Sequence, residues 1–416
     1  MLTSLLWRPL RAGDPTRTYY LLGGGTSLLL CLAFTLSQVY YITVVGLSPL
    51  QIVLVGTVLE ATCFLFEVPT GVVADLFSRR LSIIIGVLLT GLAMLLQGLS
   101  PTFAAVLLAQ VVWGVGYTFT SGADEAWITD EIGDDAVAAV FTRETQISLA
   151  MTFVGTLAAG AIGLRGTGIP MVVAGVGLLL LAIVLLVVMP ERNFERTPAG
   201  ERESFGGMAT TVRDGFLVAR RRPVVRAFFL VSLVTGLSSE AFDRLWSVRV
   251  LEDFRLPDVL GLSGPVVWFT IFALVGTTVS LVVSLLVNRY ARTLVGAHHP
   301  NRLLAVLVAL QALSVVAVAL GANLWVVLAA LWGRGAAGAV AAPVRSAWLN
   351  RHLDSRSRAT VISMNGQLDA VGQVVGGPPL GALANRTSTS AAMVVSAVVL
   401  APAVALYLRL RDRREV

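Results

Sequence analysis

Several acidic residues lie within long apolar stretches of the sequence, where an ionised side chain is costly. Glu60 and Glu67 are seven residues apart in one stretch, so on a helix they share a face, two turns from each other. Glu240, Asp243 and Asp369 lie in apolar stretches of the second half. A carboxylate at bilayer depth costs at least about 2.5 kcal/mol, so it normally faces a bundle interior or water. Its chemistry there would be to bind and release a proton or to hold a cation.

Three of these acids are our candidates for proton coupling. Glu67 and Glu60 share one helix face, and Asp369 lies in an otherwise apolar, glycine-rich stretch, two residues from Gln367. Charged groups inside a membrane also pair with one another for structural reasons. For Glu67, pairing with an arginine of a neighbouring helix is therefore as well supported as proton coupling.

Glu240 and Asp243 are better explained as members of charge pairs than as substrate ligands. They lie about one helical turn apart, and Arg244 follows Asp243 directly. Arg334 lies in the middle of another apolar stretch and needs an acidic partner, for which Glu240 or Asp369 is suitable. A role in substrate binding is the alternative for Glu240, Asp243 and Arg334.

The composition indicates that these charges are positioned by membrane-spanning helices. Hydrophobic residues make up 56% of the 416 residues, charged residues 13%, and the mean hydropathy is +0.80. These values are far from those of an average soluble domain. At about 20 apolar residues for each crossing, the chain can form roughly twelve spans, and we expect an all-α polytopic membrane protein. The predicted spans are residues 20–44, 49–76, 81–99, 103–128, 136–164, 169–189, 224–249, 264–287, 303–320, 324–350, 358–384 and 388–408.

The distribution of arginine predicts the orientation of these spans. All 31 basic residues are arginine; five fall on the predicted outer side, one within a span and the other 25 on the inner side. The outer five are Arg165, Arg244, Arg249, Arg255 and Arg386. By the positive-inside rule we expect both termini in the cytoplasm, with the protein in a bacterial inner membrane. The net charge of +6 is thus a signal of topology and not of a nucleic-acid partner.

The residue types that an enzyme would need are missing from the predicted spans. His298, His299 and His352 all fall in predicted cytoplasmic loops. Cys31 and Cys63 lie in separate apolar spans, without the spacing of a metal site or a disulfide framework. A phosphate-binding loop of the form G-x4-G-K-[ST] does not occur in the sequence. We expect no catalytic residues, no metal and no cofactor.

An internal repeat divides the sequence into two similar halves. At a constant offset of 221 residues, five positions match without a gap. They are Gly114 with Gly335, Trp127 with Trp348, Gln146 with Gln367, Gly155 with Gly376, and Gly160 with Gly381. The repeat predicts two pseudo-symmetric six-helix bundles, residues 1–190 and 224–416. Residues 191–223 would be a cytoplasmic linker with an interfacial helix near residues 205–216.

The two halves differ in charge at one position of the repeat. Asp124 and Glu125 of the first half correspond to Arg345 and Ser346 of the second. Asp124, Glu125 and Arg345 are therefore candidates for a charge pair between the halves that forms when the inner side closes. Independent drift of the two copies explains the difference equally well. The repeated Gln146 and Gln367 are candidates for substrate contact.

The residues from Gly71 to Arg80, GVVADLFSRR, resemble motif A of the major facilitator superfamily, which lies between the second and third helices. With the duplicated twelve-helix plan, the resemblance covers nearly the whole chain. It implies an inner latch, in which Gly71 permits close helix approach. Asp75 would be stabilised by the amino-terminal dipole of the eleventh helix, near Arg358, while Arg79 and Arg80 neutralise this acid and anchor the turn. At the equivalent turn of the second half, Asn288 stands where the acid would be.

Two other motifs of the family are changed in this sequence. Drug/proton antiporters of the family place an arginine before the G-x-G of the fourth helix, where this chain has Gln110. The glycine-proline element usual in the fifth helix occurs instead in the eleventh, from Gly377 to Gly381. The departure at Gln110 shifts the expected proton coupling to Glu67, Glu60 or Asp369.

The resemblance implies a secondary transporter that works by alternating access. We expect proton-coupled efflux of a hydrophobic or cationic small molecule, with Trp113 among the aromatic residues that could line its site; simple packing is the alternative for Trp113. Proton-coupled uptake of a nutrient is the closest alternative function, ahead of a polytopic membrane enzyme or a transporter-like scaffold. The expected partners are the substrate, protons and the lipid bilayer, with the protein as a monomer.

Overall fold

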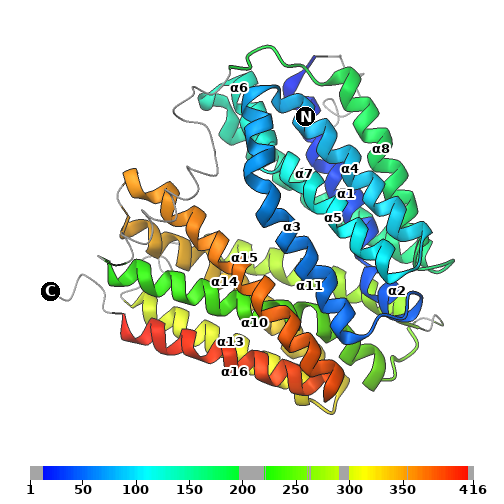
Figure 1. Ribbon diagram of the computed structural model, residues 1–416, viewed down its shortest axis with the longest axis vertical. Helices are drawn as coiled ribbons and strands as arrows, with labels where there is room; N and C mark the ends of the chain where they lie inside the picture. Colours follow the sequence, from blue (N-terminus) through cyan, green and yellow to red (C-terminus); the bar gives the residue numbers. More distant parts are fainter. Residues whose placement is uncertain are drawn as a thin grey trace. The chain divides into compact units, whose positions relative to one another are not determined.

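The computed structural model describes residues 13–195, 220, 222–259, 261, 264–289, 299–353 and 355–410, without the side chains of residues 288 and 355–359 (Figure 1). The elements in this part of the chain are α-helices joined by short connections. They form two compact units: unit 1 comprises Met1–Tyr40 and Leu65–Phe205, and unit 2 comprises Tyr41–Phe64 and Gly206–Val416. The second helix of the predicted first bundle therefore divides between the units.

Unit 1 is built from seven of the helices that the structure describes, the last part of α3 included. They are α1 (Pro15–Phe34), the end of α3 (Pro49–Leu76), α4 (Arg79–Leu99), α5 (Phe103–Thr120), α6 (Ala123–Ile132), α7 (Asp134–Gly163) and α8 (Ile169–Val188), while α2 (Ser37–Thr43) lies at its boundary with unit 2. Unit 2 contains the first part of α3 and six further helices. These are α10 (Pro223–Asp253), α11 (Pro265–Arg289), α13 (Pro300–Leu320), α14 (Leu324–Arg351), α15 (Ser355–Arg386) and α16 (Thr389–Arg409).

The prediction of twelve spans is confirmed. Within the described residues, eleven helical segments are long and apolar enough to cross a membrane, with α1 joined to α2 and α5 joined to α6 in single spans. The twelfth predicted span corresponds to α15, which at 32 residues is longer than any of the eleven but less hydrophobic than they are. Its polar character comes from Asn365, Gln367, Asp369 and Gln373, which lie along the middle of the helix.

Local sequence explains where several helices begin and break. Ser78 and Ser388 precede α4 and α16, and each side-chain oxygen accepts a hydrogen bond from a backbone N–H of the first turn. Asp14 caps α1 in the same way, with Pro15 at the first helical position. Gly122 and Gly133 have φ values of 73° and 82°, which other residues rarely adopt, and they separate α5 from α6 and α6 from α7.

The acidic residues that follow the fourth predicted span lie on helices. Asp130 and Glu131 belong to the last turn of α6, and Asp134 and Asp135 open α7 after the single connecting residue Gly133. Acidic side chains are favoured in the first turn of a helix because they complement its dipole. The fifth span thus begins two residues earlier than its hydropathy predicts.

Repeated glycines bring helices into contact in both units. In unit 1, a Cβ atom on Gly155 of α7 would overlap the backbone oxygen of Leu28 of α1. In unit 2, a Cβ atom on Gly376 of α15 would overlap the backbone oxygen of Leu237 of α10. These glycines are one of the matched pairs of the internal repeat, so the repeat preserves the same close helix approach in each half.

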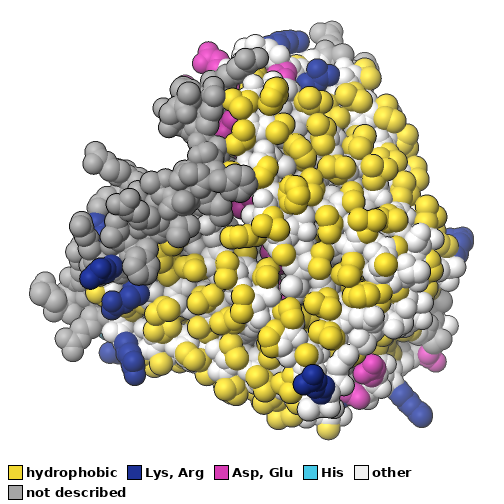
Figure 2. All heavy atoms as spheres, in the orientation of Figure 1, with side chains coloured by type: hydrophobic (Ala, Val, Ile, Leu, Met, Phe, Trp, Pro, Cys, Tyr) yellow, Lys and Arg dark blue, Asp and Glu magenta, His cyan; other side chains and the backbone are white. Residues whose placement is uncertain are grey.

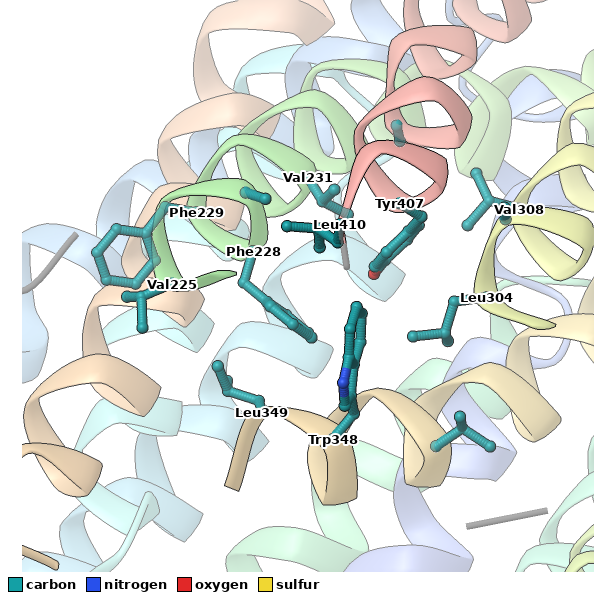
Figure 3. Packing of buried hydrophobic residues seen from close by; sticks show 14 of the residues in the cluster. Val225, Phe228, Phe229, Val231, Leu304, Val308, Trp348, Leu349, Tyr407 and Leu410 are labelled. Carbon is teal, nitrogen blue, oxygen red and sulfur yellow. The ribbon is translucent and has the colours of Figure 1, made fainter. Parts of the chain in front are cut away.

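The core of unit 2 is an aromatic cluster between α10, α14 and α16 (Figure 3). Trp348 is fully buried, and its ring centroid lies 5.3 Å from that of Phe228 and 6.2 Å from that of Tyr407. Aliphatic side chains of α13, among them Leu304 and Val308, complete the cluster. Aromatic rings at such separations add packing energy to the burial of their surface.

Hydrophobic side chains are also abundant on the outside of the helices. Leu180, Ile183 and Val187 follow one face of α8 and are all more than half exposed. Figure 2 shows hydrophobic side chains over most of the visible surface, with arginine side chains mainly near its edge. An apolar surface of this extent fits contact with lipid rather than with water.

Some expectations fall outside the described residues. They are the interfacial helix near residues 205–216, His298, and the side chains of Asn288 and Arg358.

Candidate functional site: charged groups and a cavity within the helices

The charged group of unit 2 is centred on an ion pair in α10. Nε of Arg244 donates a hydrogen bond of 3.0 Å to Oε1 of Glu240, whose side chain is only 3% exposed. The pair lies directly against α3, where a Cβ atom on Gly56 would overlap both side chains. Pairing of Glu240, favoured from the sequence, is thus found, and the partner is the arginine one turn along the same helix.

Two candidates for proton coupling lie beside this pair. Glu60 lies one turn after Gly56 on α3 and interacts electrostatically with Glu240, Arg244 and Asp369. Asp369 of α15 accepts a hydrogen bond of 2.9 Å from Nε2 of Gln373. Both carboxylates are half-buried. The fold therefore brings together two of the acids that the sequence offers for proton coupling.

Arg334 has a different partner from the two that the sequence suggested. Its Nη1 donates a hydrogen bond of 3.0 Å to Oδ1 of Asp243, not to Glu240 or Asp369. The guanidinium also lies over the ring of Phe242, 4.1 Å from the ring centroid. The prediction failed because Glu240 and Asp243 lie about one turn apart on α10, and helical spacing does not show which of them meets Arg334 of α14.

Glu67 lies apart from these charges, in unit 1. It is exposed, as are its neighbours Leu65 and Phe66 on α3. Glu67 lies two helical turns beyond Glu60 on α3, which corresponds to a rise of about 10 Å.

The two repeated glutamines lie in different environments. Gln367 is half-buried in α15, whereas Gln146 is exposed and accepts a 2.9 Å hydrogen bond from Arg143.

A cavity of about 250 Å³ lies within unit 1. Residues of α1, α4, α5, α6, α7 and α8 line it, so it is surrounded by helices of one bundle. Among them are the predicted candidates Trp113 and Asp124, together with Glu144. Glu125, which follows Asp124 in the sequence, is exposed and does not line the cavity.

Glu144 is a candidate that the sequence analysis missed. It lies in α7, and its carboxylate packs on the backbone of α1 so closely that a Cβ atom on Gly23 would overlap it. Ser148, one turn further along α7, donates a hydrogen bond to the same carboxylate. An acid inside the fifth predicted span was the available signal, but its exposed neighbours Thr142 and Arg143 resemble a helix end.

Gln110 occupies a neutral environment in α5. Its side chain is 2% exposed, and Nε2 donates to Oε1 of Gln97 at 3.4 Å and to the carbonyl oxygen of Val106 at 3.5 Å. The hydroxyl of Tyr40 donates to the backbone oxygen of Gln97. At the position of the missing arginine, the chain thus has a buried amide pair in place of a charge.

The motif A turn is fixed to the end of its own bundle. Nη1 of Arg79 donates to the carbonyl oxygen of Ala126 at 3.1 Å, and the guanidinium forms an ion pair with Asp130. Among the described residues, Arg79 is thus paired with the acid of α6 and not with Asp75, which is half-buried with Gly71 in the last turns of α3.

Glu191 makes the second connection of this turn. Its Oε1 accepts a hydrogen bond from the backbone N–H of Arg80 at 2.9 Å, and its Oε2 accepts one from the hydroxyl of Ser78 at 2.6 Å. Nη2 of Arg80 donates to the carbonyl oxygen of Leu186 at 2.6 Å. The sequence analysis missed Glu191; the signal was an acid directly after the proline that ends the sixth span.

Comparison with known proteins identifies the family. Residues 19–298 match the profile of the Major Facilitator Superfamily. YxaM of Bacillus subtilis (strain 168), described as an uncharacterized MFS-type transporter, is 25% identical over 366 residues, which are 86% of either chain.

Solved structures share the fold over almost the whole chain. The nucleoside transporter NupG matches with a TM-score of 0.74 at 14% identity, over 95% of this chain and 99% of that one. The peptide transporter POT in complex with sulfate matches with a TM-score of 0.72 at 14% identity, over 96% and 95% of the two chains. The resemblance carried by motif A and the twelve-helix plan is confirmed: this chain belongs to the Major Facilitator Superfamily and is a membrane transporter, not an enzyme.

Proposed function

We propose that the protein is a proton-coupled secondary transporter of a bacterial inner membrane, which exports a hydrophobic or cationic small molecule by alternating access. Both termini would lie in the cytoplasm, and the monomer would be the working unit. The bundles predicted at residues 1–190 and 224–416, joined by the linker 191–223, would be the moving bodies. Motif A, with Gly71, Asp75, Arg79 and Arg80, would act as the inner latch.

The observation that supports proton coupling is the grouping of charges in unit 2. Four carboxylates interact with one another there: Glu60, Glu240, Asp243 and Asp369. Glu240 and Asp243 have arginine partners in Arg244 and Arg334, while Glu60 and Asp369 lie beside them. Arg345 interacts electrostatically with Asp369. Within the described residues, the group therefore has more carboxylates than guanidinium groups.

A carboxylate without its own guanidinium can carry a proton through the transport cycle. As water access changes from one side of the membrane to the other, such a group can bind a proton on one side and release it on the other. Glu60 and Asp369 are the best placed for this role, and Glu67 is the third candidate. The guanidinium groups of Arg244 and Arg334 would keep the remaining two carboxylates ionised and in position.

The test is transport by proteoliposomes loaded with the pH dye pyranine, with ethidium as a hydrophobic cation probe and an imposed pH gradient. We expect ethidium movement opposite to proton movement. Glu60→Gln or Asp369→Asn should abolish gradient-driven transport but preserve exchange of ethidium across the membrane without a gradient. Glu252→Gln is the control, since this acid is exposed at the end of α10. Full gradient-driven transport in Glu60→Gln, Asp369→Asn and Glu67→Gln would refute the coupling assignment.

Proton-coupled uptake is the second candidate, because the nucleoside transporter NupG and the peptide transporter POT share the fold. The same vesicles can be supplied with uridine and with dialanine. Accumulation of either in the direction of proton movement, without ethidium transport, would replace export by uptake.

A further inference from the structure

The cavity of unit 1 has a wall of negative charge. Asp124 of α6 and Glu144 of α7 both line it and interact electrostatically with each other. The carboxylate of Glu144 is held between Ser148, which donates a hydrogen bond to it, and the backbone of α1 at Gly23. Among the described residues that line the cavity, none is basic. Two carboxylates therefore line a cavity to which none of the described lining residues brings a positive charge.

Aromatic and hydroxyl-bearing side chains also line the cavity. Trp113 and Tyr117 of α5 line it, and the ring of Trp113 is supported by Phe34 of α1 at a centroid separation of 4.5 Å. The hydroxyl of Thr90 is already used, since it donates to the backbone oxygen of Gly86. The hydroxyl of Thr26 also lines the cavity, and this buried group has no hydrogen-bond partner among the described residues.

We propose that this cavity binds the ammonium group of a small amine, with the apolar part of the molecule against Trp113 and Tyr117. Asp124 and Glu144 would accept hydrogen bonds from the ammonium, and Thr26 would supply a further oxygen. A buried group of two carboxylates is costly unless it is paired, and an organic cation provides both charge and donors. As a statement about the cargo, the proposal rests on the proposed function; as a statement about binding, it stands alone.

The geometry favours an organic cation over a metal ion. The described residues contain no group of three or more metal-ligating side chains. A volume of about 250 Å³ is larger than an inorganic ion needs and suits a molecule with a single ring. The aromatic side chains of Trp113 and Tyr117 provide a surface on which the apolar ring of such a molecule can pack.

The test is calorimetric titration of the purified full-length protein with benzylamine, benzyl alcohol and benzoate, which differ mainly in charge. We expect binding of benzylamine only. Asp124→Asn and Glu144→Gln should each weaken it by about tenfold or more, because each removes one of the two charges. Glu125→Gln is the matched control, as it removes the neighbouring acid that does not line the cavity.

A second pair of variants tests the geometry without changing any charge. Gly23→Ala should weaken benzylamine binding, because the added methyl displaces the carboxylate of Glu144. Gly25→Ala, on the same helix, should bind normally, since its methyl would meet only Leu181, at 3.3 Å. Thermal unfolding of each variant identifies any that fails to fold.

Three results would overturn the proposal. They are absence of benzylamine binding, equal binding of benzyl alcohol, and equal weakening by Glu125→Gln and Glu144→Gln. If benzylamine does not bind but the protein takes up a proton in a way that depends on Glu144, the cavity is a proton-binding site only. If benzylamine binds as expected while the vesicles show no gradient-driven transport, the binding site stands and the proposed function fails.

Discussion

Gly56 of α3 lies directly against Glu240 of α10, with no space for a side chain between them. We predict that Gly56→Ala disturbs the Glu240–Arg244 ion pair and lowers the free energy of unfolding by about 1–3 kcal/mol, as overpacking usually does. Gly276→Ala in α11 is the control, because nothing lies within 4 Å of its added methyl. Chemical unfolding in detergent measures both, and equal stability of the two variants would contradict the packing.

Arg244 and Arg334, two arginines of unit 2 that form ion pairs, should differ in their effect on stability. Arg244→Gln leaves Glu240, at 3% exposure, without its cation, and should cost about 3–5 kcal/mol. Arg334→Gln leaves Asp243, at 50% exposure, and should cost about 1 kcal/mol. The comparison of the two unfolding free energies decides this point. A larger loss in Arg334→Gln would mean that burial of the carboxylate does not control the cost.

The glycines matched by the repeat should be equally intolerant of substitution. Gly155→Ala and Gly376→Ala each place a methyl against a backbone oxygen of a neighbouring helix, which cannot move aside as a flexible side chain can. Both should fold poorly, as monitored by the yield of monodisperse protein. Gly366→Ala in α15 meets nothing within 4 Å and should express normally. Normal expression of Gly376→Ala would argue against the close contact of α10 and α15.

The repeated tryptophans are both fully buried but differ in hydrogen bonding. Nε1 of Trp127 donates to the carbonyl oxygen of Pro190 at 2.8 Å, whereas Nε1 of Trp348 has no partner in the described part of the chain. Replacement by phenylalanine removes the same volume at either position. Trp127→Phe should therefore cost about 1 kcal/mol more than Trp348→Phe, the net contribution of one hydrogen bond. Denaturant midpoints that show no difference, or the opposite order, would contradict this reading.

Ser78 should contribute more to stability than the other serine cap, Ser388. Both hydroxyls accept a hydrogen bond from the first turn of a helix, but Ser78 also donates to the carboxylate of Glu191. Ser388→Ala should cost about 1 kcal/mol, and Ser78→Ala about 1.5–3 kcal/mol more, because a bond to a charged group is lost as well. Thermal unfolding of Ser78→Ala in a Glu191→Gln background should show a smaller effect, and an unchanged effect would exclude the coupling of the two residues.

Most of the helical framework could be read from the sequence. Hydropathy locates the spans to within a few residues because a helix that crosses the membrane needs a long run of mostly apolar side chains. Its backbone N–H and C=O groups form their hydrogen bonds within the helix. The helix cap at Ser78 likewise follows from residue type, because it depends only on the first turn of α4, which follows directly in the sequence.

The partners of the charged residues were decided by the tertiary structure alone. Arg334 meets Asp243 rather than Glu240, Glu144 lies on Gly23, and Glu191 closes the motif A turn. Each of these contacts depends on how one helix is rotated against another. Hydropathy does not show that rotation, because the lipid and the interior of the bundle are equally apolar, so an apolar side chain can face either. Small residues and polar groups determine which helix faces pack together. The sequence by itself determined which helices form, which family they build and which charges they carry; only the packed helices decided which charges meet.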